Sequence, residues 1–240
     1  MDSKNSTNRF GDYSKKGEYH RNIDINWIYY PIYRAKINYL KKIFKSFRKN
    51  SRVLDIGCGE GVFVDYLIKE GFDASGLDLN YSSDTVTLGN IKSTNFKNNY
   101  FDIILILDVL EHMNILEQEM ALLETRRILK PNGVAIISVP NLAHFSSRLS
   151  FLITGKLLRT STITRHPGDR PFAEFKEMIS RFFIIEKIKG LFPTFPVTLY
   201  LTTKKPSLMV GWHDYLNSIN FPVGWCFLNI FICYKRNTFE

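Results

Sequence analysis

A glycine-rich segment has the residue types and spacing of a ligand-binding turn. It reads VLDIGCGEG, Val53 to Gly61, and a short apolar run leads into Gly57, Gly59 and Gly61. Glycine adopts positive φ angles and lets a ligand approach the backbone without a Cβ in the way. A helix that begins after such a turn presents unpaired amides and a partial positive charge. We therefore expect these glycines to cradle a bound ligand.

The glycine spacing and the acidic residue before it discriminate between cofactor classes. The pattern is G-x-G-x-G, whereas dinucleotide-binding turns have G-x-G-x-x-G. Asp55 lies just before the turn. A buried carboxylate there would repel a pyrophosphate and suit a cationic cofactor or one with an ammonium group. This favours S-adenosylmethionine over NAD.

A second acidic residue, Asp78, ends the next apolar segment in GLDLN, Gly76 to Asn80. A carboxylate at this place can accept hydrogen bonds from both ribose hydroxyls, as the corresponding residue of dinucleotide folds does. Taken alone, Asp78 is interpreted as a strand-end turn residue. Its distance after the glycine turn favours the ribose role.

The elements that would position these residues alternate along the chain. Apolar runs predict strands over 52–56, 74–79, 86–88, 101–107 and 134–139. Helical spacing or helix signals predict helices over 26–48, 62–69 and 114–129, the last with Asn114 as N-cap and Glu117 completing a capping box. This alternation is typical of a parallel sheet built from right-handed crossovers.

The last third of the chain is less regular. We predict a helix over 172–182, strands over 183–189 and 226–234, and a loop-rich insertion over 193–224. The expected fold is α/β, a Rossmann-like doubly wound and mostly parallel seven-stranded sheet with helices on both faces and an antiparallel C-terminal edge. Residues 1–50 would form an N-terminal arm and covering helix, and residues 51–240 one domain, with 141–180 and 193–224 as acceptor-side lid and insertion.

Composition narrows the class of protein. The 240 residues are 45% hydrophobic and 23% charged, the balance of a soluble globular protein. No apolar run approaches the roughly 20 residues that span a bilayer, and the N-terminus lacks a signal-peptide core, so we expect a cytoplasmic location. The three cysteines lack metal-ligand spacing and predict neither a metal site nor a disulfide framework. The net charge of +9 suggests an anionic partner, although scattered surface lysines explain it as well.

Four segments in order resemble the motifs of class I S-adenosylmethionine-dependent methyltransferases. They are VLDIGCGEG, GLDLN, YFDIILILDVLEHM (100–113) and ILKPNGVAIISVPN (128–141). The run DVLEH is similar to the branch that includes ubiquinone-biosynthesis O-methyltransferases and bacterial glycan and natural-product methyltransferases. The resemblance covers Arg34 to Asn141 well and the C-terminal third loosely.

The resemblance implies roles for individual residues. Asp55, Gly57, Cys58 and Gly59 would line the methionine and ribose part of S-adenosylmethionine. The remaining implied contacts are Asp78 to the ribose, Leu79 against the adenine, Asn90 and Ile91 at the adenine amino group, the Leu107 carbonyl to the ammonium group, and Arg34 to the carboxylate. The family often has an acidic residue where this chain has Asn90, and Arg34 is equally well explained as a surface arginine.

Methyl transfer to a hydroxyl also needs a base. His112, beside Glu111, is one candidate, although it could instead brace the following helix. His144 and His166 lie on predicted loops that could cover the acceptor. Around His166, Arg165 and Arg170 could bind an anionic group of the acceptor.

Two further stretches bear on the acceptor side. In the family branch the N-terminal helix often covers the cofactor. Aromatic residues there could form a wall over the cofactor or simply pack in the core; they are Trp27, Tyr29, Tyr30 and Tyr33. An amphipathic stretch could touch a lipid-like acceptor or a membrane face, or else cover the sheet edge; it contains Phe145, Arg148, Phe151, Leu152 and Lys156.

The acceptor itself is left open by the sequence. We expect methyl transfer to a hydroxyl of a small molecule, glycan or lipid intermediate. RNA or protein is the alternative acceptor, motivated by the basic charge, but no Asn-Pro-Pro-Tyr-type motif follows the 101–107 strand. A non-catalytic S-adenosylmethionine-binding subunit is the third interpretation, opposed by the intact glycine turn and Asp78.

Overall fold

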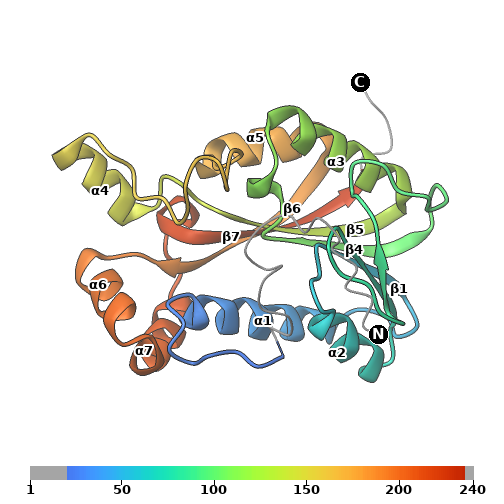
Figure 1. The fold of residues 1–240 in the computed structure, drawn as a ribbon, viewed down its shortest axis with the longest axis horizontal. Helices are drawn as coiled ribbons and strands as arrows, with labels where there is room; N and C mark the ends of the chain where they lie inside the picture. The colour runs from blue at the N-terminus through green and yellow to red at the C-terminus, as the bar shows by residue number, and fades with distance from the viewer. Residues whose placement is uncertain (1–20, 236–240) are drawn as a thin grey trace, which may run out of the picture.

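A seven-stranded sheet runs through the centre of residues 21–235, the part of the chain that the computed structural model describes (Figure 1). The strand order is β3-β2-β1-β4-β5-β7-β6, and only β7 runs antiparallel to its neighbours. The strands are β1 Arg52–Ile56, β2 Asp73–Asp78, β3 Val86–Leu88, β4 Phe101–Leu107, β5 Leu129–Pro140, β6 Phe183–Pro193 and β7 Cys226–Lys235. The predicted Rossmann-like class and the antiparallel C-terminal edge are confirmed.

Helices cover both faces of the sheet. They are α1 Tyr30–Phe44, α2 Val62–Lys69, α3 Ile115–Ile128, α4 Phe145–Thr154, α5 Phe172–Phe182, α6 Pro196–Lys204 and α7 Pro206–Ser218. In Figure 1, α3 and α5 lie above the sheet, and α1, α2 and α7 lie below it. Helix α4 projects at the end of the molecule that also carries α6 and α7.

The core is divided between the two faces by the period of the strands. In β4, Ile104 and Ile106 belong to the core under α3 and α5, whereas Ile103 and Leu105 belong to the core over α1 and α2. Successive side chains of a strand point to opposite faces, so a strand covered on both sides is apolar throughout. This is why the continuous apolar run of residues 101–107 is a central strand.

Local signals set several element boundaries. Asn114 accepts a hydrogen bond from the Glu117 amide, and the Glu117 side chain returns one to the Asn114 amide, which confirms the predicted capping box of α3. Pro31 lies in the first turn of α1, where its missing N–H costs nothing. Helix α1 begins at Tyr30, four residues later than the predicted start of the helical segment.

The region between β6 and β7 differs from the prediction. Residues 193–224 were expected to be loop-rich, but most of them form α6 and α7. Each of these helices has a proline in its first turn, Pro196 and Pro206, where proline is compatible with a helix. The helices also expose many apolar side chains, so they lack the polar outer face that usually reveals a surface helix.

The topology brings the predicted site residues to one edge of the sheet. Asp55 of β1 is in register with Gly76 of β2 and with Leu105 of β4. The carboxyl ends of these three parallel strands therefore meet, which is the usual ligand crevice of open α/β sheets. Within residues 21–235, no helix is long and apolar enough to span a bilayer.

Candidate active site

The glycine turn after β1 has the strained backbone that only glycine adopts readily. The φ angles are +71° at Gly57, +55° at Gly59 and +73° at Gly61. The Gly57 amide donates a hydrogen bond to the Leu77 carbonyl at 2.7 Å, which ties the turn to β2. A Cβ added at Gly57 would lie 2.4 Å from Cγ2 of Val109. The turn is thus a cradle that a side chain would fill.

Asp78 closes the opposite side of the turn. One carboxylate oxygen accepts a hydrogen bond from the Gly59 amide at 2.9 Å, and the other accepts one from the Asn80 amide at 2.8 Å. Each oxygen keeps acceptor capacity, because a carboxylate has about four lone-pair sites. Leu79 follows with half of its surface exposed, 50%, which leaves an apolar side chain free to pack on a flat ring.

Asp55 is buried beneath the turn, and its Oδ1 has no hydrogen-bond partner among the described residues. Burial raises the pKa of Asp55 to about 7; Lys36 opposes this shift and Asp78 adds to it. An unpartnered buried carboxylate oxygen is costly unless a ligand or water satisfies it. The residues present therefore fit a cofactor that carries a cationic or hydrogen-bond-donating group.

Lys36 is a site residue that the sequence interpretation missed. Its side chain is 9% exposed, and Nζ lies 2.5 Å from Oδ2 of Asp108. Asp108 follows β4 with φ +57° and also accepts a hydrogen bond from the Ser138 hydroxyl. A signal was present in the sequence, because Lys36 stands on the apolar face of α1, four residues from both Ile32 and Leu40.

Arg34, by contrast, points away from this group. Its Nη1 lies 3.0 Å from Oδ2 of Asp214 in α7, and both side chains are exposed. The helical period explains the difference, since residues two apart on a helix face different directions. The predicted contact of Arg34 with a cofactor carboxylate stays a prediction, and Lys36 is the cation that this structure brings to Asp55.

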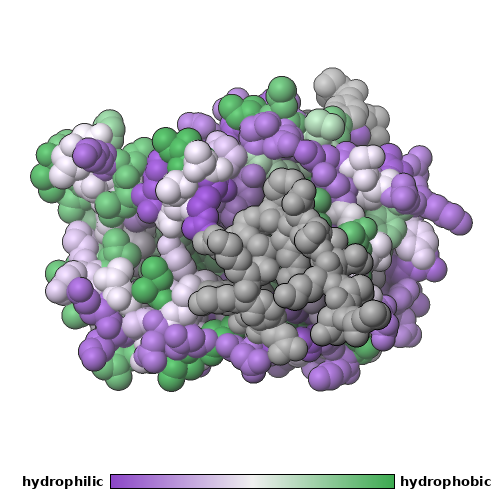
Figure 2. All heavy atoms as spheres, in the orientation of Figure 1, coloured by the Kyte–Doolittle hydropathy of each residue, from purple (hydrophilic) through white to green (hydrophobic). Residues whose placement is uncertain are grey.

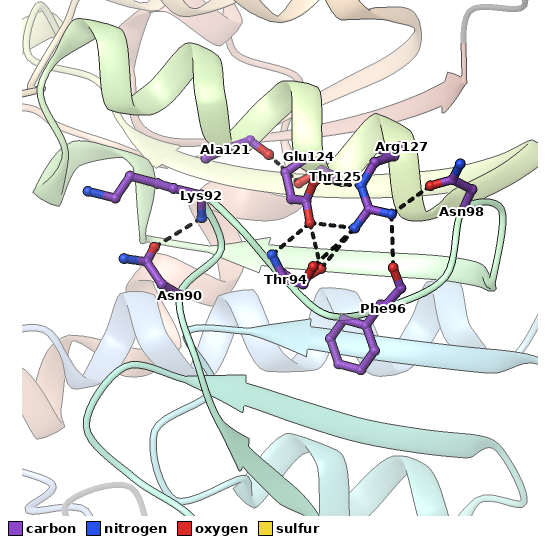
Figure 3. A network of polar contacts seen from close by, with 9 residues as sticks. All are labelled: Asn90, Lys92, Thr94, Phe96, Asn98, Ala121, Glu124, Thr125 and Arg127. Carbon is purple, nitrogen blue, oxygen red and sulfur yellow. Dashed lines mark hydrogen bonds and ion pairs between the residues drawn. The ribbon is translucent and has the colours of Figure 1, made fainter.

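The segment after β3 carries the predicted adenine contacts. Ile91 is buried in the core, and the side chain of Asn90 accepts a hydrogen bond from the Lys92 amide. Figure 3 shows how α3 holds the rest of the segment, with Arg127 donating hydrogen bonds to the Phe96 carbonyl and the Asn98 side chain. Glu124 accepts hydrogen bonds from the amide and the hydroxyl of Thr94.

The remaining predicted cofactor residues lie on either side of the turn. Cys58 is half-buried, and burial raises the pKa of its thiol, which makes it a packing group rather than a nucleophile. Leu107 is half-buried at the end of β4 and pairs with Ser138 of β5. The structure therefore gathers the glycine turn, Asp55, Asp78 and the end of β4 at one edge.

The two predicted catalytic histidines meet. The ring centroids of His112 and His166 are 4.5 Å apart, edge to face at 88°. Nδ1 of His166 lies 3.4 Å from Oδ1 of Asp169, whose side chain is 5% exposed. Removal from water lowers the pKa of His112, with a further contribution from His166. His166 thus has a buried carboxylate on one side and a largely neutral imidazole on the other.

A second buried carboxylate links this cluster to the cofactor side. Glu111 is 3% exposed, and burial raises its pKa well above the usual range, with Asp108 and Asp169 adding to the shift. The Glu111 carbonyl accepts a hydrogen bond from the Gly168 amide, which fixes the His166 loop to the turn after β4. Residues 108–111 therefore connect the two histidines, His112 and His166, to the residues around the glycine turn.

Two tyrosines, one in α1 and one just before it, lie near the histidine pair and the glycine turn. The Tyr29 hydroxyl donates a hydrogen bond to the Thr160 carbonyl at 3.2 Å, and burial next to Asp169 raises its pKa. Burial and the charges of Asp55 and Glu60 raise the pKa of Tyr33 to about 12. The ring of Trp27 lies 5.5 Å from that of Tyr29 and 6.3 Å from that of Tyr33. These contacts bring Trp27, Tyr29 and Tyr33 together over the site.

Two residues expected on the acceptor side, His144 and Arg170, have hydrogen-bond partners within the protein. His144, expected on a loop that could cover the acceptor, lies just before α4; it is 3% exposed and caps α4 by accepting a hydrogen bond from the Ser147 amide. Burial lowers its pKa to about 4. Arg170 turns inward and donates a hydrogen bond to Gln118, while the Arg165 carbonyl approaches the His112 ring.

Comparison with known proteins agrees with this geometry. A family described as "Methyltransferase domain" matches residues 29–182. A ubiquinone biosynthesis O-methyltransferase of Rickettsia bellii is 27% identical over 183 residues, which cover 68% of this chain and 75% of the relative.

Solved structures share the fold. The PH0226 protein of Pyrococcus horikoshii superposes with a TM-score of 0.60 and 18% identity, over 95% of this chain and 100% of that one. Phosphoethanolamine N-methyltransferase 2 of Haemonchus contortus, solved with S-adenosyl-L-methionine, superposes with a TM-score of 0.53 and 18% identity, over 84% of this chain and 52% of that one. The chain belongs to the methyltransferase domain family and is a class I S-adenosylmethionine-dependent methyltransferase.

Proposed function

We propose that this enzyme methylates a hydroxyl oxygen of a small organic acceptor and that His166 removes the hydroxyl proton. The observation that carries the proposal is the contact of His166 with buried Asp169, in a loop that hydrogen bonds to the turn after β4. A histidine oriented by a carboxylate is the usual arrangement of a general base. The R. bellii relative, named as an O-methyltransferase, supports an oxygen acceptor.

The residues around the glycine turn supply the other half of the reaction. S-adenosylmethionine, when bound, supplies a methyl group on a positively charged sulfur and leaves as a neutral thioether. Gly57 and Gly59 would admit it to the backbone, Asp78 would accept from its ribose hydroxyls and Leu79 would pack on its adenine. Asp55 would accept from its ammonium group. The enzyme's contribution is then alignment of donor and acceptor, together with proton removal.

The protonation states of the cluster suit this role. A lowered pKa keeps His112 neutral at pH 7, so that it adds no positive charge beside His166. Asp169 is held by Arg159 at 3.5 Å as well as by His166, and its burial strengthens both contacts. As the acceptor oxygen forms its bond to the methyl carbon and the carbon–sulfur bond breaks, the proton of the hydroxyl would pass to Nε2 of His166. The stretch 141–180 would then be the acceptor-side lid.

An acceptor panel tests the proposal. Matched pairs that differ only in the acceptor atom, such as a phenol and the corresponding aniline, a sugar and the amino sugar, and a hydroxylated and an amino lipid, are incubated with the enzyme and S-adenosylmethionine. Release of S-adenosylhomocysteine is measured. We expect turnover with members of the hydroxyl series. Turnover confined to amines, or to RNA or protein, would reject a hydroxyl acceptor.

A further inference from the structure

Helices α6 and α7 carry large apolar side chains on their solvent-facing sides. Between 43% and 76% of each of these side chains is exposed. On each helix the first of them lies four residues from another, and all three fall on one side of that helix. The residues are Val197, Tyr200 and Leu201 of α6, and Leu208, Trp212 and Tyr215 of α7.

This arrangement is the reverse of an ordinary surface helix. Helix α7 already buries His213 and Leu216 on its inner side, against the domain. The outer side of such a helix is normally polar, because it faces water. Here the outer side of α7 carries three large apolar side chains and one charged residue, Asp214, a composition that suits contact with a second apolar medium.

A third apolar element lies at the same end of the molecule. Phe151, Leu152 and Ile153 at the end of α4 are exposed, Leu152 by 82%. The start of α4 packs on the residue before α6, with the rings of Phe145 and Phe195 5.5 Å apart. Figure 1 places α4, α6 and α7 together at the left, and Figure 2 shows hydrophobic residues around them. We call the exposed apolar residues of these three helices the apolar end.

The charged residues around the apolar end are mostly basic. Residues 145–168 contain four basic residues and no acidic one, namely Arg148, Lys156, Arg159 and Arg165. Residues 194–213 contain Lys204 and Lys205 and again no acidic residue. The nearby acidic residues Asp169 and Asp214 each pair with an arginine, Arg159 and Arg34. Exposed apolar side chains among mostly basic residues match the chemistry of an anionic lipid surface, whose headgroups attract the cations while the interface accepts the apolar groups.

We infer that the apolar end is a docking surface for an anionic phospholipid bilayer. Side chains such as Leu152, Leu208 and Trp212 enter the headgroup–acyl boundary, and Lys204 and Lys205 contact the phosphates. A second copy of the chain fits less well, because a symmetric dimer through this end would oppose the same basic residues on both subunits. The inference holds whichever molecule accepts the methyl group.

The test uses the full chain and two kinds of vesicle. Binding is measured by co-sedimentation with phosphatidylcholine vesicles and with vesicles that contain 30% phosphatidylglycerol. We expect binding to the anionic vesicles, weakened by high salt, together with a blue shift of tryptophan emission from Trp212 and Trp225. Lys204→Glu/Lys205→Glu and Leu152→Ser/Leu208→Ser should each lower the partition coefficient about tenfold or more.

A matched control distinguishes binding through the apolar end from nonspecific hydrophobic adsorption. Ile115 and Leu116 of α3 are also exposed, by 57% and 71%, and α3 lies apart from α4, α6 and α7 (Figure 1). Ile115→Ser/Leu116→Ser should bind vesicles as the wild type does. All variants should keep their circular dichroism and S-adenosylmethionine affinity, because each replaced side chain is on the surface. Absence of vesicle binding by the wild type, an equal loss in the control, or a concentration-dependent dimer that Leu152→Ser/Leu208→Ser dissociates would each overturn the inference.

Discussion

Lys36 of α1 and Asp108 at the end of β4 form an ion pair, with 2.5 Å between Nζ and Oδ2. The pair joins the covering helix to the edge of the sheet where the cofactor residues gather. The positive charge of Lys36 also lowers the pKa of Asp55, which burial and Asp78 raise. Lys36 therefore stabilises the charged forms of Asp55 and Asp108, which would otherwise repel one another where water is largely excluded.

Replacing Lys36 should weaken cofactor binding. In Lys36→Met the pKa of Asp55 should rise further, so that less of the carboxylate is ionised at pH 7. We expect S-adenosylmethionine affinity, measured by calorimetry, to fall about tenfold, equivalent to roughly 1.4 kcal/mol. Lys42→Met on the exposed side of the same helix is the control and should leave affinity unchanged. If the two variants bound S-adenosylmethionine with equal affinity, Lys36 would have no part in cofactor binding.

The glycine turn can be tested against a glycine of the same backbone geometry. Gly57 has φ +71° and a Cβ there would collide with Val109, whereas Gly155 has φ +68° and nothing within 4 Å. Both alanine variants bear the strain of a positive φ, about 1 kcal/mol. Only Gly57→Ala should also lose S-adenosylmethionine affinity, by tenfold or more in calorimetry. A similar loss in Gly155→Ala would mean that strain, not the cradle, decides binding.

The raised pKa of Asp55 predicts how stability depends on pH. The folded state holds a proton up to about pH 7, whereas the unfolded chain releases it near 3.8. Between these values the folded state binds more protons, so this group's contribution to stability falls as the pH rises. Urea unfolding at several pH values should show that slope in the wild type relative to Asp55→Asn. In the same variant, the rise of cofactor affinity with pH through about 7 should vanish.

Much of this site followed from residue types alone because the signals are local. The glycine turn needs positive φ angles, and Asp78 is tied to it by distance along the chain, so both could be placed from sequence. The meeting of His112 and His166 could not, since it depends on how the loop at Gly168 hydrogen bonds to Glu111. The sequence named both histidines, but only the tertiary structure brings them together.

What the sequence did not provide has an equally physical origin. The family resemblance named Arg34 and gave no role to Lys36, and only the structure shows that the helical period directs Arg34 toward Asp214 and Lys36 toward Asp108. His144 lies before α4, as expected, but the sequence did not show that its ring caps the first turn of that helix. Helices α6 and α7 were missed because their exposed faces are apolar. In each case a tertiary contact or an unusual surface overrode a local preference.

The network in Figure 3 predicts that Arg127 supports the adenine side of the site from a distance. Its guanidinium holds the 94–98 segment through the Thr94 and Phe96 carbonyls. Arg127→Met should loosen that segment and raise the dissociation constant for S-adenosylmethionine several-fold, with a stability loss of about 1–2 kcal/mol in urea unfolding. Arg181→Met, which removes an exposed ion pair with Glu119, should change neither quantity appreciably.

The proposed base can be separated from a merely structural histidine by the acidity of the acceptor. His166→Gln should lower kcat on a neutral phenol by about 10²–10⁴-fold, because proton removal contributes that much to such reactions. Asp169→Asn should lower it less, since Asp169 orients the ring without touching the acceptor. His112→Gln is the matched control within the pair of rings, and cofactor affinity should be unchanged in all three.

On a phenol acidic enough to be ionised at the assay pH, no proton remains to be removed, and the His166→Gln defect should largely disappear. A defect of the same size on both acceptors would assign His166 to positioning and leave the base to another group.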